Sequence, residues 1–213
     1  MNIFRILGDL SHLASIFILI HKITTSRSCR GISFKTQLLY LIVFVTRYVN
    51  LFYPRSVYLI SMKIFFIASS AYILYLMKVR YRNRLDVDID TIRLELLIGV
   101  PAVLSLIFNY KFTPLEVAWS FSIFLESVAI LPQMFLLQRL GEAEMITTHY
   151  IFALGAYRAL YICNWIYRLI FEPRHSFDWI TFLAGLVQTG LYLDFFYIYF
   201  TKVMRGQKFE LPA

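Results

Sequence analysis

The chain has 213 residues and a formal net charge of +8; 59% of its residues are hydrophobic and only 16% are charged. Soluble domains contain about 45–50% hydrophobic and about 25% charged residues, so this composition excludes a soluble globular protein. The 20 phenylalanines and 15 tyrosines also exclude a disordered chain. The sequence therefore predicts an all-α integral membrane protein.

Seven apolar stretches each approach the roughly 20 residues that a transmembrane helix needs. Because the gaps between them are short, we expect a seven-helix transmembrane domain over 1–201 and a tail over 202–213, with no soluble domain. Seven helices can be divided into two triplets around a linker helix. The predicted stretches run over residues 2–20, 36–53, 57–77, 93–112, 115–137, 147–170 and 178–201.

Basic residues gather on one side of the predicted helices. The first, third and fifth gaps and the tail contain 12 lysines and arginines, whereas the opposite side has only three, Arg55, Lys111 and Arg174. Cytosolic loops are enriched in these residues, so we expect a lumenal N-terminus, a cytosolic C-terminus and no nucleic-acid partner. The first stretch is expected to be retained, because Asp9 and His12 interrupt its apolar run and no small-residue cleavage site follows.

Five cations lie inside the predicted helices, where each costs at least about 2.5–3.5 kcal/mol unless it is paired, hydrated or functional. Guanidinium groups bind carboxylates in bidentate geometry, so several arginines near one aqueous mouth predict an anionic ligand with more than one carboxylate. The alternative is internal salt bridging, in which Arg5 pairs with Asp9 and Arg158 with Glu126. The cations that the predicted topology places in the lumenal half are Arg5, Arg47 and Arg168.

Helical spacing places polar residues on shared faces of four predicted helices. Because such faces do not point at lipid, we expect them to converge on a polar cavity. Two of the faces consist of Arg5, Asp9 and His12 in 2–20, and of Arg47 and Asn50 in 36–53. The other two consist of Glu116, Trp119, Ile123 and Glu126 in 115–137, and of Tyr157, Tyr161, Asn164 and Arg168 in 147–170.

His12 lies deep in this predicted cavity. A histidine in a helix is often only a hydrogen-bonding group, but the charged residues on the same face predict a pH sensor here. The sequence shows no metal-ligand spacing and no Ser/His/Asp arrangement, so we expect no metal, no cofactor and no enzyme activity. Cys29 lies in a gap and Cys163 within a stretch, so no disulfide is expected.

The tail over 202–213 is basic. It could anchor to anionic lipid, or it could act as a sorting signal that a vesicle coat reads. Glu142 and Glu144 lie on the same predicted side of the membrane, so a latch between an acid and a tail lysine could mask the signal.

Six motifs spread along the chain belong together. They are Met-Asn-Ile-Phe-Arg-Ile-Leu-Gly-Asp-Leu-Ser-His (1–12), Arg47-Tyr48, Phe-Thr-Pro-Leu-Glu (112–116), Phe-Leu-Glu-Ser-Val-Ala-Ile-Leu-Pro-Gln (124–133), Gly-Glu-Ala-Glu (141–144) and Ala-Gly-Leu-Val-Gln-Thr (184–189). These motifs resemble the ER lumen protein-retaining receptors, the K-D-E-L receptor family, and the resemblance spans essentially the whole chain. It implies a seven-helix fold related to the SWEET and PQ-loop transporters, with two triple-helix bundles. It also implies a receptor that binds C-terminal K-D-E-L or H-D-E-L signals in the acidic Golgi, returns in COPI vesicles and releases its cargo in the ER.

The resemblance also implies roles for individual residues. The carboxylate-binding arginines correspond to Arg5, Arg47 and Arg168. The rest of the ligand pocket corresponds to Tyr48, Asn50, Glu116, Trp119, Tyr157, Tyr161 and Asn164. The pH-sensing network corresponds to His12, Glu126 and Tyr157. The residues of sorting and coat binding correspond to Lys202, Arg205 and Lys208 in the tail, to Glu144 as the latch partner and to Asp194, which matches a position linked to retrograde transport.

Two positions depart from the family pattern. Many members have Asp where Asn50 stands, and Asn lacks the countercharge that Asp offers to the Lys of K-D-E-L, so we expect a preference for H-D-E-L. Gln207 stands where animal members tend to carry a lysine, which makes Lys208 the substitute latch candidate. Outside the resemblance, an arginine-lined cavity would also suit a transporter of organic anions, and a structural scaffold remains a third class.

Overall fold

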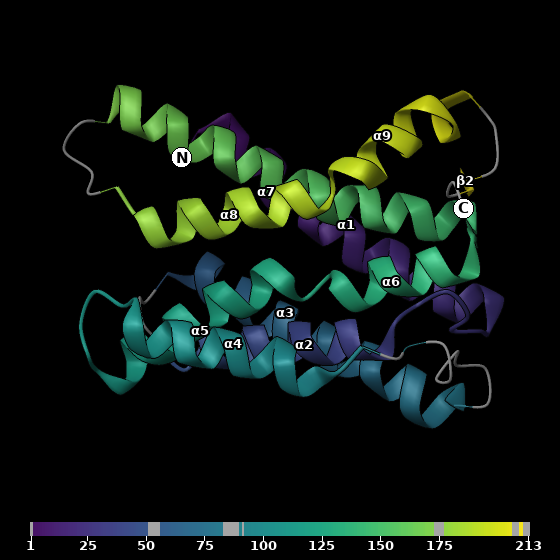
Figure 1. Ribbon diagram of the computed structural model, residues 1–213, viewed down its shortest axis with the longest axis horizontal. Helices are drawn as coiled ribbons and strands as arrows, with labels where there is room; N and C mark the ends of the chain where they lie inside the picture. The colour runs from purple at the N-terminus through teal and green to yellow at the C-terminus, as the bar shows by residue number, and fades with distance from the viewer. Residues whose placement is uncertain are drawn as a thin grey trace. The chain divides into compact units, whose positions relative to one another are not determined.

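The computed structural model describes residues 2–50, 56–82, 90, 92–172, 177–205 and, for the backbone, 209–210. The chain divides into two compact, almost entirely helical units (Figure 1). Unit 1 comprises residues 1–31 and 137–213, and unit 2 comprises residues 32–136.

In unit 1, helix α1 (Ile3–Ser26) packs along most of the longer helix α7 (Met145–Phe171). Glycine permits this close approach, because a Cβ on Gly8 of α1 would lie only 2.8 Å from Cδ2 of Tyr161 on α7. Helix α7 also contacts α8 (Trp179–Leu191) and α9 (Leu193–Thr201).

The stretch expected to form one helix over 178–201 is divided into α8 and α9, which are bent by 44° at Tyr192. At the break the Tyr192 N–H donates to the Thr189 carbonyl at 3.0 Å, which is a tighter turn than an α-helix makes. The Tyr192 ring is fully buried against α7, where a Cβ on Gly155 would lie 2.7 Å from it. Close packing on a glycine of α7 therefore accompanies the bend.

In unit 2, helix α2 (Phe34–Arg47) contacts α3 (Val57–Tyr75) and α5 (Pro114–Val128), and α5 also contacts α4 (Leu94–Ile107). Helix α3 continues into a π-helical turn, η1 (Leu76–Arg80). The N-termini of α2 and α5 are capped by hydroxyl groups, because Ser33 accepts from the Thr36 N–H and Thr113 from the Glu116 N–H.

Three predicted helices of unit 2 differ from the expected ranges, and the one expected over 93–112 ends at Ile107. The stretch 115–137 is interrupted after Val128, and α6 (Leu131–Leu140) follows. Pro132 explains the interruption, because its ring cannot donate a backbone hydrogen bond and clashes with the preceding turn. The helix expected over 36–53 ends at Arg47, so the prediction that Arg47 and Asn50 share a helix face is wrong.

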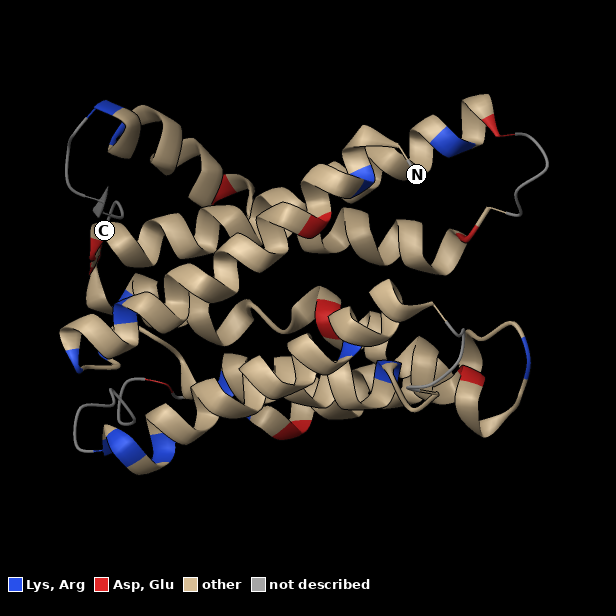
Figure 2. Ribbon diagram, turned by 180° about the vertical axis from the view of Figure 1, so that it is seen from behind, with Lys and Arg blue, Asp and Glu red and all other residues tan. Residues whose placement is uncertain are grey.

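Several helices are apolar and long enough to cross a membrane. Within the described residues these are Ile3–Ser26, Val57–Arg80 and Pro114–Leu140, and the bent pair α8 and α9 would add a fourth span. Charged residues lie mostly near helix ends and loops, with a few inside the helices (Figure 2). The chain is thus a helical membrane protein, while the count of seven spans and their division into two triplets stay predictions.

The two cysteines differ in environment. Cys29 is fully buried in the loop after α1, and burial raises its pKa to about 11 despite the opposing charge of Lys22, whereas Cys163 is exposed on α7. A thiol reacts through its thiolate, so Cys29 should resist iodoacetamide at neutral pH in the folded protein, and its labelling should rise with pH. Mass spectrometry of a Cys163→Ser variant checks this, with the SDS-denatured protein as control; rapid labelling of the native variant would contradict it.

Candidate ligand-binding site

The polar face predicted for α1 meets the polar face predicted for α7 inside unit 1. The Tyr161 hydroxyl donates to Asp9 Oδ1 at 2.5 Å, and the ring of Tyr157 stacks on the ring of His12 at 4.2 Å. His12 and Tyr157 are 8% and 3% exposed, respectively. The i, i+4 and i+7 spacings seen in the sequence therefore do place these side chains on contacting faces.

A third contact, at the start of α1, was not expected. Asn2 caps the helix by accepting from the Arg5 N–H at 3.0 Å, and its Nδ2 donates to Asn164 Oδ1 at 2.8 Å. Asn164 is 3% exposed. A capping residue at the N-terminus was recognisable in the sequence, but its partner on α7 was not.

The side chain of Arg5 is half-buried between these contacts along α1. Within the described part of the chain, its guanidinium forms no hydrogen bond or ion pair. Asp9, the acid one turn further along α1, accepts from Tyr161 instead. The internal salt bridge considered between Arg5 and Asp9 is therefore absent, and Arg5 presents a cation on the face shared with α7.

Arg168 pairs with an acid that lies outside the predicted helices. Its Nε lies 2.9 Å from Oε2 of Glu172, four residues later and just past the end of α7. The two side chains are 29% and 46% exposed, and such solvent-accessible pairs contribute only about 0–1 kcal/mol. A competing anion can therefore displace Glu172 at little cost.

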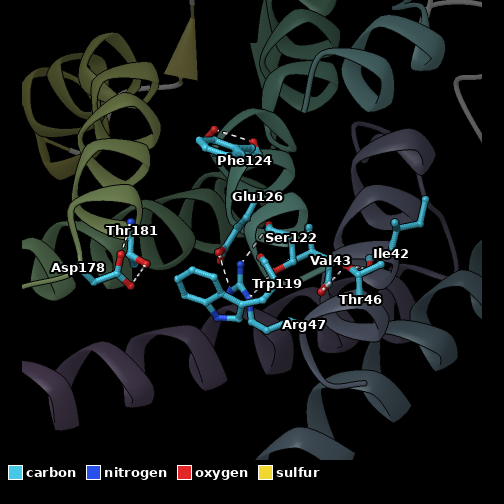
Figure 3. A network of polar contacts seen from close by, with 11 residues as sticks. Ile42, Val43, Thr46, Arg47, Trp119, Ser122, Phe124, Glu126, Asp178 and Thr181 are labelled. Carbon is cyan, nitrogen blue, oxygen red and sulfur yellow. Dashed lines mark hydrogen bonds and ion pairs between the residues drawn. The ribbon is translucent and has the colours of Figure 1, made fainter. Parts of the chain in front are cut away.

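Arg47 makes a much more buried pair in unit 2 (Figure 3). Its Nη1 lies 2.7 Å from Oε2 of Glu126, whose side chain is 1% exposed. Nε and Nη2 of Arg47 donate to the hydroxyl and the carbonyl of Ser122, each at 3.1 Å. Glu126, assigned to the pH-sensing network, is thus also the acid that neutralises a predicted ligand-binding arginine.

Arg158 was the cation proposed for Glu126 in the internal-pairing alternative. It belongs to the other unit, where it is 4% exposed and lies over the ring of Trp165 at 5.5 Å. Its neighbour on α8 is Gly185, at which a Cβ would lie 3.6 Å from the Arg158 Nε. Within unit 2, Arg47 is the cation on Glu126.

Four further predicted pocket residues lie in unit 2. The Tyr48 ring stacks on Phe44 at 6.1 Å, and Asn50 lies beyond the end of α2, where its carbonyl accepts from Lys63. Glu116 is in the first turn of α5 and Trp119 one turn later, both half-buried. These residues and Arg47 belong to one unit and Arg5 and Arg168 to the other, so convergence of all of them on one cavity stays a prediction.

The sorting residues are only partly within the described structure. Glu144 precedes the first residue of α7, where its side chain makes no capping hydrogen bond, and it pairs with Lys22 of α1 at 3.5 Å. Lys22, which is 1% exposed, also donates to the Arg30 carbonyl at 2.6 Å. Lys208 lies outside the described residues. The other three positions are half-buried Lys202, exposed Arg205 in a 3₁₀ turn (η3, Val203–Arg205) and exposed Asp194 in the first turn of α9.

The tail contacts the Gly-Glu-Ala-Glu segment through its backbone. Strand β1 (Glu142–Ala143) pairs antiparallel with β2 (Phe209–Glu210). Within the described residues Glu144 pairs with Lys22, and the tail pairs with β1 through its main chain. Neither feature could be read from residue spacing. The latch between Glu144 and a tail lysine stays a prediction, because Lys208 lies outside those residues.

Comparison with known proteins agrees with the resemblance. Residues 28–168 match the family model described as ER lumen protein retaining receptor. The chain is 54% identical to the ER lumen protein-retaining receptor of Drosophila melanogaster, and 56% and 54% identical to the ER lumen protein-retaining receptor 2 of Gallus gallus and of Homo sapiens. Each alignment covers 100% of both chains. The chain therefore belongs to the ER lumen protein-retaining receptor family, a family of receptors and not of enzymes.

Proposed function

We propose that the protein binds C-terminal H-D-E-L or K-D-E-L signals of soluble ER proteins in the Golgi and returns them to the ER in COPI vesicles. The signals bind at acidic pH and dissociate at the neutral pH of the ER. The N-terminus is lumenal and the C-terminus cytosolic, where Lys202, Arg205 and Lys208 engage the coat. The relatives' names, which describe retention of ER lumen proteins, support this class of cargo.

The observation that carries the proposal is that the Arg5 guanidinium has no internal acid as a partner among the described residues. A half-buried guanidinium without an internal acid among the described residues is costly unless a ligand or water satisfies it. Beside it, Asn164 and Tyr161 hold defined positions through Asn2 and Asp9. A peptide carboxylate supplies the charge and the paired oxygens that a guanidinium prefers.

Arg47 and Arg168 fit the proposal as arginines that exchange partners. Each holds one internal carboxylate, Glu126 or Glu172, and an acidic peptide end offers replacements for both. The exchange at Arg168 costs little free energy, because its pair with Glu172 is solvent-accessible. The exchange at Arg47 takes a neutralising cation away from buried Glu126, which favours uptake of a proton by this site on binding.

A pair of peptides tests this function. A peptide ending in His-Asp-Glu-Leu with a free carboxylate should bind the purified protein at acidic pH, and the same peptide with a C-terminal amide should bind at least about tenfold more weakly. Isothermal titration calorimetry in detergent measures both. Equal affinity of the two peptides, or no binding of either, would refute the proposal.

His12 is expected to make binding depend on pH. The His12 ring is buried against Tyr157, so its protonation adds a positive charge next to an anionic ligand. If protonation favours binding, the bound ligand favours protonation in return, and affinity falls as pH rises by at most about tenfold per pH unit per proton. His12→Ala should flatten the curve of affinity against pH; an unchanged slope would exclude the histidine as a sensor.

Asn50 is expected to set the preference between signals. Its uncharged side chain offers no countercharge to the first residue of K-D-E-L, so H-D-E-L should bind more tightly. Asn50→Asp should raise the affinity for K-D-E-L more than the affinity for H-D-E-L. Competition between the two peptides measures the ratio, and tighter K-D-E-L binding by the unchanged protein would contradict the expectation.

A further inference from the structure

We propose that Asn2 is a positioning residue that fixes the side-chain amide of Asn164 so that this amide offers a donor to the ligand. This inference rests on the proposed function and names one further residue that its specificity requires. The juxtaposition that carries it lies entirely in unit 1, where Asn2 of the α1 cap meets Asn164 of α7.

The side chain of Asn2 makes two contacts of different kinds. Its Oδ1 accepts from the Arg5 N–H at 3.0 Å, which commits the oxygen to the helix cap. The Nδ2 group must therefore be the part of Asn2 that faces α7, and it donates to Asn164 Oδ1 at 2.8 Å. The cap thus determines which end of the Asn2 amide reaches its neighbour.

The consequence for Asn164 follows from the chemistry of amides. A side-chain amide has an acceptor end and a donor end, and only neighbouring hydrogen bonds decide which way it is turned. With its oxygen held by Asn2, Asn164 directs its Nδ2 elsewhere, and within the described residues that nitrogen makes no hydrogen bond. The free end of Asn164 is thus a donor, which matches the oxygens of an acidic peptide terminus.

The location of the pair adds to the argument. Asn164 is 3% exposed and lies on the same face of α7 as Tyr161 and Arg168. Asn2 is three residues from Arg5, so the same amide also sets the start of the helix turn that carries this cation. A single side chain therefore holds the Asn164 amide and caps the helix turn that carries Arg5.

A double-mutant cycle tests the inference. Asn2→Ser retains a helix cap, because serine is a good capping residue, but its hydroxyl is too short to hold Asn164. Affinity for a peptide ending in His-Asp-Glu-Leu should fall about five- to tenfold for Asn2→Ser, whereas in an Asn164→Ala background the same change should cost less than about twofold. The melting temperature of each variant reports whether the fold is kept.

Each other result has a defined meaning. An equal loss in both backgrounds would show that Asn2 contacts the ligand or acts through Arg5, and would overturn the inference. A lower melting temperature with unchanged affinity would show a purely structural role, and would overturn it as well. Absence of peptide binding by the unchanged protein would instead refute the proposed function, together with the inference that rests on it.

Discussion

Arg5→Ala is expected to abolish peptide binding while leaving the melting temperature of the protein nearly unchanged. Removal of a cation that pairs with a desolvated carboxylate costs about 2–5 kcal/mol of binding free energy, and each 1.4 kcal/mol is tenfold in affinity. Stability should be kept because the Arg5 guanidinium forms no hydrogen bond or ion pair with the described residues. Calorimetric titration and a thermal melt of the same preparation measure both quantities.

The matched control for Arg5 is the conservative variant Arg5→Lys. It keeps the charge but loses the planar fork that binds a carboxylate through two hydrogen bonds, so it should restore only part of the affinity. Full affinity of Arg5→Ala would show that this arginine does not touch the ligand. A large fall in melting temperature would show that it holds the fold instead.

Arg47→Ala should abolish binding and also destabilise the protein. The change removes the cation that lies 2.7 Å from Oε2 of Glu126, a side chain that is 1% exposed, and removing one member of a buried pair costs about 3–5 kcal/mol. For a chain of this size the melting temperature should fall by about 10 °C. The hydrogen bonds to Ser122 are lost in the same change.

The double variant Arg47→Ala/Glu126→Gln separates the two roles of Arg47. It also removes the carboxylate charge that Arg47 neutralises, so it should recover most of the lost stability, yet it should not recover peptide binding. Recovery of binding would show that Arg47 serves only to neutralise Glu126. A melting temperature for Arg47→Ala equal to that of the unchanged protein would contradict the structural importance of the buried pair.

The helical spacing in the sequence was sufficient to predict the polar faces of α1 and α7, but not that these helices are neighbours. Tyr157, Tyr161 and Asn164 recur at i, i+4 and i+7, and polar residues in an apolar stretch must face protein, so their shared face was readable. Their contacts with His12 and Asp9 follow once α1 and α7 are neighbours. The sequence does not state which helices are neighbours; only the expected convergence of polar faces on one cavity connected these two.

Ion-pair partners were much harder to predict. Glu172, Glu126 and Lys22 were each visible as charges, but spacing along one helix does not determine pairs between helices or pairs across a helix end. Helix ends were predictable only where a local signal existed, as at Pro132. No proline or glycine stands at the end of α2, so its end at Arg47 was not predictable in this way.

The most direct test is the affinity of the unchanged protein for a His-Asp-Glu-Leu peptide at about pH 5.5 and at about pH 7.2, the range in which histidine titrates. Titration in two buffers of different ionisation enthalpy also counts the protons taken up on binding. We predict tighter binding at the lower pH, by about ten- to a hundredfold, with net proton uptake. Equal affinity at both pH values with no proton uptake would contradict a site in which an acidic peptide end and a proton bind together.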